Sequence, residues 1–240
     1  MMPAYMNWSG GKDSSLCLHR ILQDKKYRVD YLLTSVNAEH NRISMHGVRR
    51  ELLKSQADSL SITLETVELP DQPGMKDYEK AMSDKTSILK SRGCDHAIFG
   101  DIFLEDLRRY RELKLDEQKI DCVFPLWKIP SRELVEEFLE LGYKAVIVCV
   151  NEKWLGKKFC GRLIDESLLN DLPENVDPCG ENGEYHSFVF DGPIFSHPVH
   201  FQKGEIVYRR YTAPENSTAT GVAFDHPSTV GFYFCDLLPG

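Results

Sequence analysis

The stretch AYMNWSGGKDSS (Ala4–Ser15) places two glycines, a lysine, an aspartate and three serines directly after a short apolar run. We interpret residues 4–8 as a buried strand and residues 14–25, where apolar side chains recur at near-helical spacing, as a helix. Glycines let a backbone turn tightly and present its N–H groups to an anion, and the N-terminal end of a helix attracts the same ligand. The stretch therefore predicts a phosphate-binding loop between the first strand and the first helix.

The residues of this loop have expected roles. Ser9 and Ser14 supply hydroxyl donors, and Gly10 and Gly11 let backbone N–H groups approach an anion. Lys12 adds a mobile positive charge. Asp13 would cap the helix or ligate a Mg²⁺ that accompanies a nucleotide. The spacing matches neither the Walker pattern GxxxxGK[ST] nor GxGxxG. An ordinary Gly-Gly turn, with a solvated lysine and a capping aspartate, is the structural alternative.

Strand-like and helix-like stretches alternate along the first half of the chain. Strands are expected at 29–36, 62–69 and 96–101, and helices at 48–60 and 75–93. This order is typical of a parallel sheet with helices on both faces. Ligands of such sheets bind beyond the carboxyl ends of the strands, so the loops at 9–14, 34–37 and 100–101 should meet there. The expected phosphate site therefore also includes Ser35, Gly100 and Asp101.

The pattern changes near residue 127. An amphipathic helix at 132–141 and a strand at 144–150 follow, and from residue 195 the chain is typical of antiparallel strands with turns. We predict a Rossmann-like α/β domain at residues 1–127 and a smaller α+β domain at residues 128–240.

Composition limits the classes of function. The chain has 240 residues, of which 42% are apolar, and a formal charge of -8, which disfavours non-specific binding of nucleic acid. No apolar run approaches the ~20 residues that span a bilayer, and the N-terminus lacks a signal-peptide pattern. The seven cysteines contain no CxxC pair, which argues against a zinc site or a disulfide framework. We expect a cytoplasmic protein with no membrane partner and with reduced cysteines in its core.

A second polar segment, CGENGEYH (Cys179–His186), concentrates acceptors and a candidate base. Glu181 and Glu184 could hold an amine or an ammonium ion, and one carboxylate could remove a proton during attack by nitrogen. If the segment is extended, Asn182, Glu184 and His186 share one side. The alternative is a polar turn at Gly180 and Gly183 that leads into an edge strand.

Other candidates carry weaker signals. Arg108 and Glu112, four residues apart on a helix, would bind a phosphate or carboxylate or form a surface ion pair. His46 would contact adenine or substrate, or pack against the next helix. Cys179 as a nucleophile lacks a visible activating histidine, and His197 with His200 lacks a third metal ligand.

These motifs together resemble known proteins. SGGKDS (9–14) resembles the pyrophosphate-binding loop of the N-type ATP pyrophosphatases, the PP-loop superfamily. The segments 100–112, 125–127 and 179–195 are similar, in order and spacing, to the diphthine–ammonia ligase family, and SMHGV (44–48) resembles its bacterial branch. The resemblance implies an adenine nucleotide α-hydrolase-like (HUP) fold. It also implies adenylation of a carboxylate or amide oxygen, release of AMP and pyrophosphate, and displacement of AMP by ammonia.

The resemblance and the residue chemistry together give a set of expected site residues. The catalytic residues would be Lys12, Glu181, Glu184 and His186. The residues that bind ATP would be Ser9, Gly10, Gly11, Lys12, Asp13, Ser14, Ser35, Gly100 and Asp101. The residues that bind substrate would be Arg108, Glu112, Gly180, Glu181, Asn182, Gly183 and Glu184. ATP and Mg²⁺ are the expected cofactors, with Asp13 as the candidate metal ligand.

Several alternatives stay open. The expected partners are ATP, ammonia or an amine donor, and an acceptor that is either a modified protein side chain or a small metabolite. The same adenylation chemistry could act on a metabolite related to cobalamin precursors or on a tRNA base, although the acidic charge disfavours nucleic acid. A sensor that binds adenine nucleotides without turnover is the non-enzymatic alternative, and self-association of the chain is left open.

Overall fold

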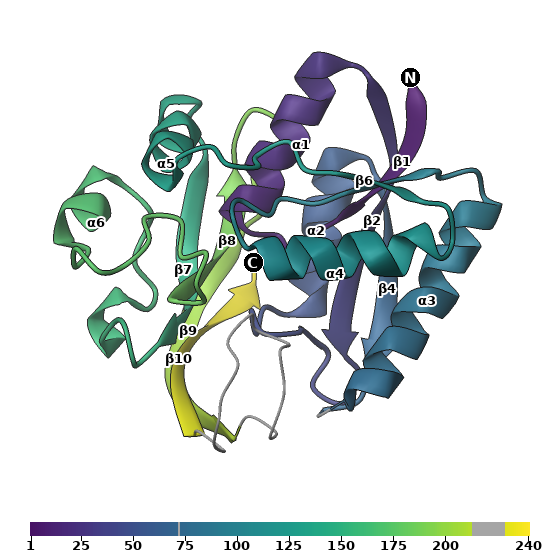
Figure 1. Ribbon diagram of the computed structural model, residues 1–240. Coiled ribbons are helices and arrows are strands. Elements are labelled where there is room, and N and C mark those ends of the chain that lie inside the picture. The colour runs from purple at the N-terminus through teal and green to yellow at the C-terminus, as the bar shows by residue number, and fades with distance from the viewer. Residues whose placement is uncertain (72, 213–228) are drawn as a thin grey trace.

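The computed structural model describes residues 1–71, 73–212 and 229–240. Its first half is built on a sheet of parallel strands, with one short antiparallel addition (Figure 1). From one edge to the other the parallel strands are β4 (Thr63–Leu69), β2 (Tyr27–Asn37), β1 (Met2–Asn7), β5 (His96–Ile98) and β6 (Asp121–Val123). The short β3 (Arg42–Ile43) pairs antiparallel with the end of β2. The predicted parallel α/β sheet is confirmed.

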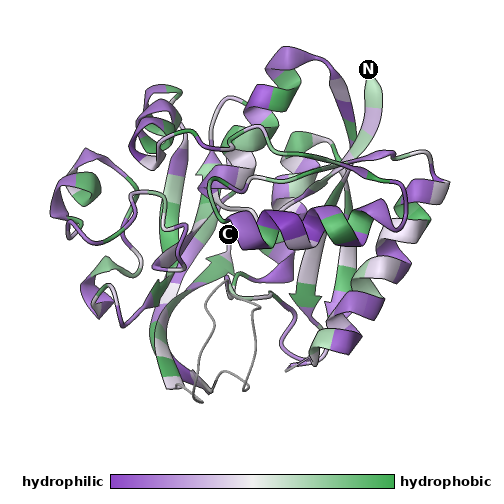
Figure 2. Cartoon of the chain, in the orientation of Figure 1, coloured by the Kyte–Doolittle hydropathy of each residue, from purple (hydrophilic) through white to green (hydrophobic). Residues whose placement is uncertain are grey.

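Helices cover both faces of this sheet because the side chains of a strand alternate between its faces. In β1, Ala4 and Met6 pack in the cluster that includes buried residues of α1 (Lys12–Asp24) and α2 (Arg50–Leu60). Tyr5 instead packs in the cluster that includes residues of α3 (Met75–Ser91) and α4 (Glu105–Asp116). Figure 2 shows the helices banded in hydrophilic and hydrophobic colours, as expected for helices with one buried face.

The second half adds an antiparallel sheet with smaller helices. Its strands follow the order β8 (Tyr185–Asp191), β7 (Lys144–Asn151), β10 (Thr229–Pro239) and β9 (Phe201–Thr212). The helices α5 (Ser131–Glu140) and α6 (Glu166–Asp171), with a short 3₁₀ turn at Lys157–Phe159, complete this half. The predicted α+β character is confirmed, and β8 lies at an edge of the sheet, as the alternative interpretation of Cys179–His186 expected.

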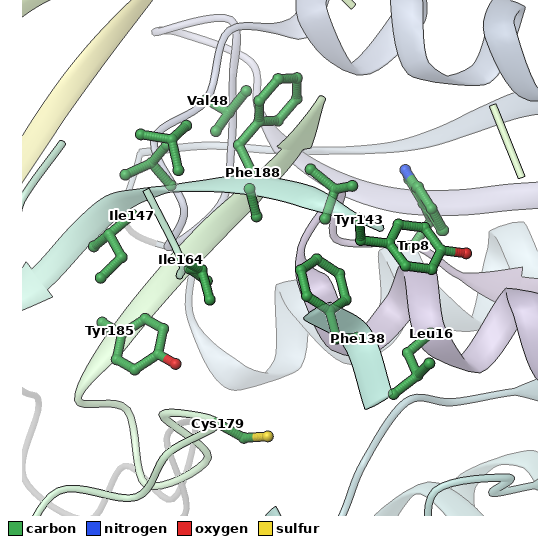
Figure 3. Packing of buried hydrophobic residues seen from close by; sticks show 14 of the residues in the cluster. Trp8, Leu16, Val48, Phe138, Tyr143, Ile147, Ile164, Cys179, Tyr185 and Phe188 are labelled. Atoms are coloured by element: carbon green, nitrogen blue, oxygen red, sulfur yellow. The ribbon is translucent and has the colours of Figure 1, made fainter. Parts of the chain in front are cut away.

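One hydrophobic cluster joins the two halves. It includes Trp8 and Leu16 from the first half and Phe138, Ile147 and Phe188 from the second (Figure 3). The antiparallel sheet is therefore packed directly against α1 and the loop that precedes it. The division of the chain at residue 127 stays a prediction.

The cysteines behave as core residues. All seven are free thiols; Cys122 is half-buried and the others are buried. Burial raises the pKa of Cys122 and of Cys160 to about 12. The prediction of reduced core cysteines agrees with this. Among the described residues, no helix is long and apolar enough to cross a membrane.

Candidate active site

The glycine loop between β1 and α1 is fixed by contacts with both halves of the chain. Gly10 has a φ of +75°, the left-handed region that favours glycine. Its carbonyl accepts hydrogen bonds from Gln56 Nε2 (3.0 Å) and from the Val189 N–H (2.9 Å). Gln56 is completely buried and also accepts a bond from Trp8 Nε1 (3.0 Å). The loop conformation is therefore imposed by α2 and β8.

The helix after the loop begins earlier than the sequence pattern predicted. Gly11 occupies the N-cap position and α1 begins at Lys12, so the expectation that Asp13 caps the helix is wrong. The hydroxyls of Ser14 and Ser15 donate to the Gly11 carbonyl at 2.9 and 3.0 Å. Asp13 lies in the first turn, where a carboxylate interacts favourably with the helix dipole.

Lys12 lies where the two halves of the chain meet. Only 3% of its surface is exposed, and its backbone N–H donates to Ser187 Oγ (3.1 Å) on β8. Its ammonium donates to both Asp13 carboxylate oxygens (2.7 Å each) and to the carbonyl of Cys179. Burial by itself lowers the pKa of Lys12, but the Asp13 carboxylate, with Cys179 and Tyr185, acts in the opposite direction, and together they raise this pKa well above its ordinary value. Lys12 is therefore a permanently charged group at the start of α1.

The segment that contacts Lys12 is a turn, not an extended strand. Glu184 is completely buried and accepts hydrogen bonds from the N–H groups of Asp177 (3.1 Å) and Asn182 (2.9 Å) and from Asn182 Nδ2 (3.0 Å). Asn182, Glu184 and His186 would share one side only in an extended segment, and that condition is not met because residues 181–184 turn before β8 begins. The structural alternative, a polar turn at Gly180 and Gly183, describes the local conformation. Glu184 uses its carboxylate to hold this turn together.

Glu181 points away from the turn toward the loop after β5. Its Oε1 accepts a hydrogen bond from the Ile102 N–H (2.8 Å). Burial raises the pKa of Glu181 to about 8, and the nearby Asp13 and Asp101 carboxylates contribute. A carboxyl group with a pKa near neutrality can both hold and release a proton, which general acid–base catalysis requires.

Asp101 follows β5 and meets the same region. A Cβ atom at Gly100 would lie 3.1 Å from the Asp13 carbonyl, so this loop is packed on the start of α1. Asp101 Oδ1 pairs with Arg111 Nη2 (3.1 Å), while Asp101 Oδ2 and Arg111 Nε are buried without a hydrogen-bond partner. Burial raises the pKa of Asp101, with Arg111 acting in the opposite direction. The predicted meeting of the loops after β1 and β5 is confirmed.

A pair of histidines lies beside the loop. The rings of His46 and His186 stack with their centroids 4.4 Å apart. Burial lowers the pKa of both, to about 4 for His186 and well below the ordinary value for His46. Both imidazoles are therefore neutral at pH 7. His46 Nδ1 is buried without a partner.

The helix α4 contributes a residue that the sequence did not single out. Arg108 forms the predicted ion pair with Glu112 (2.8 Å). Its guanidinium also lies over the rings of Phe124 and Trp127. Its neighbour Arg111, one turn along the helix, reaches Asp101 instead. The anionic partner of Arg111 is therefore a carboxylate of the same chain.

Two further contributors had no sequence signal. Gln56 lies within an ordinary helical pattern, and Ser187 within a strand pattern, yet both bind the glycine loop.

Ser35 lies near the end of β2, where its carbonyl accepts a hydrogen bond from the Ser44 N–H (3.1 Å). Cys179 is buried, and this burial raises its pKa, so its thiol is protonated at neutral pH.

Metal binding has little support in the geometry. Across residues 1–71, 73–212 and 229–240, no group of three or more His, Cys, Asp or Glu side chains could hold a metal ion. Asp13 engages Lys12 with both carboxylate oxygens, and His197 Nδ1 lies 3.0 Å from Ser196 Oγ. A Mg²⁺ ion at this site would have to bind mainly through the phosphates of a nucleotide.

Two family models match this chain, one in each half. Residues 2–116 match the N-terminal domain of diphthamide synthase, and residues 130–213 match its C-terminal domain. This chain belongs to the diphthamide synthase family. The first matched region contains Lys12 and Asp101, and the second contains Glu181 and Glu184, so the residues described above come from both matched regions.

Relatives of this diphthamide synthase family member include named ligases. The chain is 31% identical over 87 residues to the diphthine–ammonia ligases of Bos taurus and Homo sapiens. It is 28% identical over 86 residues to that of Schizosaccharomyces pombe. These matches cover 34% of this chain, but only 33% of the two mammalian proteins and 14% of the yeast protein. The chain thus spans a third or less of these relatives.

Two solved structures are partly similar to this chain. A predicted tRNA methyltransferase subunit from Methanocaldococcus jannaschii is 19% identical, with a TM-score of 0.39, over 65% of this chain and 82% of that chain. A U34-tRNA thiolase from Methanococcus maripaludis is 22% identical, with a TM-score of 0.37, over 59% of this chain and 57% of that chain.

Proposed function

We propose that this chain is an ATP-dependent amide-forming ligase that resembles diphthine–ammonia ligase. In this proposal the enzyme transfers AMP from ATP to an acceptor carboxylate or amide oxygen and releases pyrophosphate. Ammonia then attacks the activated carbon and displaces AMP. Family membership and the named ligase relatives support this reaction class.

The position of Lys12 is the observation that carries the proposal. Lys12 begins α1 directly after the glycine loop, and its ammonium also contacts the Cys179 carbonyl of the second polar segment. A nucleotide that binds the loop would therefore place its phosphates beside the segment proposed to handle the nitrogen nucleophile. A phosphate oxygen that binds Lys12 must replace one of its present contacts.

The residues of the loop have distinct proposed tasks. Backbone N–H groups at the start of α1 and the Lys12 ammonium would bind the β- and γ-phosphates. This stabilises the charge that develops on pyrophosphate as the bond to the α-phosphorus breaks. Ser9, Ser14 and Ser35 are proposed to bind the same nucleotide, with Mg²⁺ held by its phosphates.

The two glutamates of the second segment are proposed to act differently. Glu181 is proposed to accept a proton from the attacking nitrogen, because its pKa is near neutrality and its carboxylate lies beside Asp13 and Asp101. Glu184 would be a positioning residue, since its carboxylate is occupied by Asp177 and Asn182. The neutral His186, stacked on His46, would line the acceptor site.

The acceptor is proposed to be a modified protein side chain such as diphthine, or a small carboxylate-bearing metabolite. Arg108 and Glu112 lie on the surface of α4, where they could contact the acceptor outside the nucleotide site. The balanced reaction joins ATP, the acceptor carboxylate and ammonia to give the amide, AMP and pyrophosphate. The carbon–nitrogen bond forms as the carbon–oxygen bond to AMP breaks, and AMP keeps that electron pair.

The test is product analysis of ATP turnover with ammonium and a panel of acceptors. The panel contains a diphthine-bearing protein, small carboxylic acids and unmodified tRNA, and the wild type is run beside Lys12→Ala and the exposed control Lys76→Ala. We expect AMP and pyrophosphate with one acceptor only, and their loss in Lys12→Ala alone. Formation of ADP and phosphate would contradict the proposal, as would tight ATP binding without AMP from any acceptor. The second outcome would favour a nucleotide sensor.

A further inference from the structure

The strand β8 of the second half lies directly against the start of α1 (Figure 1). The Val189 N–H donates to the Gly10 carbonyl (2.9 Å), and the Lys12 N–H donates to Ser187 Oγ (3.1 Å). A Cβ atom at Gly11 would lie 3.2 Å from the Ser187 carbonyl oxygen and 3.4 Å from Ser187 Oγ. The glycine loop therefore contacts β8 along three successive residues, Gly10, Gly11 and Lys12.

The Ser187 hydroxyl binds the part of α1 that attracts anions. The Lys12 N–H is the first amide of α1, and the first amides of a helix have no partner within the helix. Such amides, together with the helix dipole, form a ready anion site. Because Ser187 Oγ accepts a hydrogen bond from this amide, a phosphate that binds at the end of α1 has this hydroxyl as a neighbour.

The Ser187 hydroxyl also keeps an unused hydrogen. A serine hydroxyl can donate one hydrogen bond and accept two. The bond from the Lys12 N–H uses one lone pair, and in the part of the chain that the structure describes the hydroxyl donates to no acceptor. Only 4% of Ser187 is exposed, so water has little access to it. A ligand with oxygen acceptors, such as a phosphate, would complete the hydrogen bonding of this group.

The serines that follow the glycine loop are less available to a ligand. Ser14 and Ser15 already donate their hydroxyl hydrogens to the Gly11 carbonyl, at 2.9 and 3.0 Å. A phosphate would have to break either bond before it could accept from these groups. The hydroxyl hydrogen of Ser187 can be donated without such an exchange.

We propose that Ser187 is a phosphate-binding residue supplied by the second half of the chain. Its hydroxyl accepts the Lys12 N–H and donates to a β- or γ-phosphate oxygen of ATP. The inference rests on the ligase function proposed above, and it extends the nucleotide site beyond the first half. Consecutive hydrogen bonds polarise one another, and a bond to a charged phosphate oxygen is stronger than one between neutral groups.

The position of Ser187 connects the two sides of the proposed reaction. Ser187 directly follows His186, which is proposed to line the acceptor site, and β8 begins directly after the turn that Glu184 holds together. A phosphate bound by Ser187 is therefore joined to the acceptor side through one short strand.

The test is calorimetric titration of ATP, pyrophosphate and AMP, each with Mg²⁺, into the wild type, Ser187→Ala and Ser59→Ala. Ser59 is a matched control because it is also a buried serine that joins the two halves, through its bond to the His197 carbonyl (2.6 Å). We expect Ser187→Ala to weaken the binding of ATP and pyrophosphate by about tenfold, the effect of one lost hydrogen bond to a charged group. Binding of AMP, which has neither a β- nor a γ-phosphate, should stay unchanged, and Ser59→Ala should bind all three like the wild type.

A purely structural role for Ser187 gives a different result. If the hydroxyl only stabilises the start of α1, Ser187→Ala weakens the binding of ATP, pyrophosphate and AMP by the same factor, and the inference is overturned. If Ser187→Ala fails to fold, Ser187→Cys decides, because a thiol has a similar shape but is a weak donor. Equal ATP binding in the wild type and the variant rejects only the role of Ser187, whereas no ATP binding in the wild type rejects the ligase proposal as well.

Discussion

Gly10 has a conformation and surroundings that no other residue type fits without cost. Its φ is +75°, and a Cβ atom there would lie 2.6 Å from Gln56 Oε1. Gly142 has a similar φ of +80° but open space around it, so it is a matched control for backbone strain alone. Gln56 cannot move freely because it also binds Trp8 and Val189.

We predict that Gly10→Ala lowers the free energy of unfolding by about 2–4 kcal/mol, and Gly142→Ala by about 1 kcal/mol. The difference arises from the contact with Gln56. Urea unfolding of the two variants at pH 7 measures it. Equal losses in both would show that Gln56 moves aside, and the loop would then be less tightly fixed than its hydrogen bonds indicate.

Glu181 gives the chain a pH dependence of stability. The folded state raises its pKa from 4.5 to about 8, so the folded chain holds this proton more tightly than the unfolded chain. Stability from this group is therefore fully present below pH 4.5 and is lost as the pH rises toward 8. Glu181→Gln removes the titration while it keeps an acceptor for the Ile102 N–H.

We predict that Glu181→Gln and the wild type have similar stability at pH 5 and that the variant is more stable by about 2–4 kcal/mol at pH 9. The measurement is denaturant unfolding at pH 5, 7 and 9 in buffers without ammonium. A constant difference across this range would mean that Glu181 titrates near its ordinary pKa. That result would also remove its proposed role as a base.

At the scale of elements, the turn before β8 depends on one side chain. Glu184 accepts three hydrogen bonds from residues of that turn, while Glu174, in the same connection, is exposed. We predict that Glu184→Ala costs about 2–4 kcal/mol of stability and that Glu174→Ala has little effect. Hydrogen exchange should show faster exchange of the Asp177 and Asn182 amides in Glu184→Ala only.

The alternative role of Glu184 gives a different result. If its carboxylate binds substrate and does not organise the turn, Glu184→Ala leaves both amides protected and changes only turnover. Glu184→Gln, which keeps one carbonyl acceptor, should fall between the wild type and Glu184→Ala in exchange rate.

At the scale of the whole molecule, the sequence predicts the first half well. Apolar runs alternate with amphipathic stretches there, and the glycine loop marks the end of β1, so the parallel sheet and its helices follow from local patterns. The meeting of the loops after β1 and β5 can also be predicted, because the carboxyl ends of parallel strands lie at one edge of a sheet. The very short β3 and β6 carry too few residues for a periodic signal.

The site is less predictable because its contacts join distant parts of the chain. The bond from Lys12 to the Cys179 carbonyl spans 167 positions, and that from the Lys12 N–H to Ser187 spans 175. A pattern within ten residues identifies a candidate side chain but not its partner. For that reason Glu184 and Glu181 look equivalent in the sequence, yet one holds the turn and the other faces Asp13 and Asp101.

The central claim is that the phosphates of ATP bind the glycine loop at Lys12. Its most direct test is calorimetric titration of ATP and of AMP, both with Mg²⁺, into the wild type, Lys12→Gln and the exposed control Lys76→Gln. We predict that Lys12→Gln weakens ATP binding by about tenfold or more, the effect of a lost charged hydrogen bond, while AMP binding and the control change little. Equal ATP affinity in Lys12→Gln and the wild type would contradict the account.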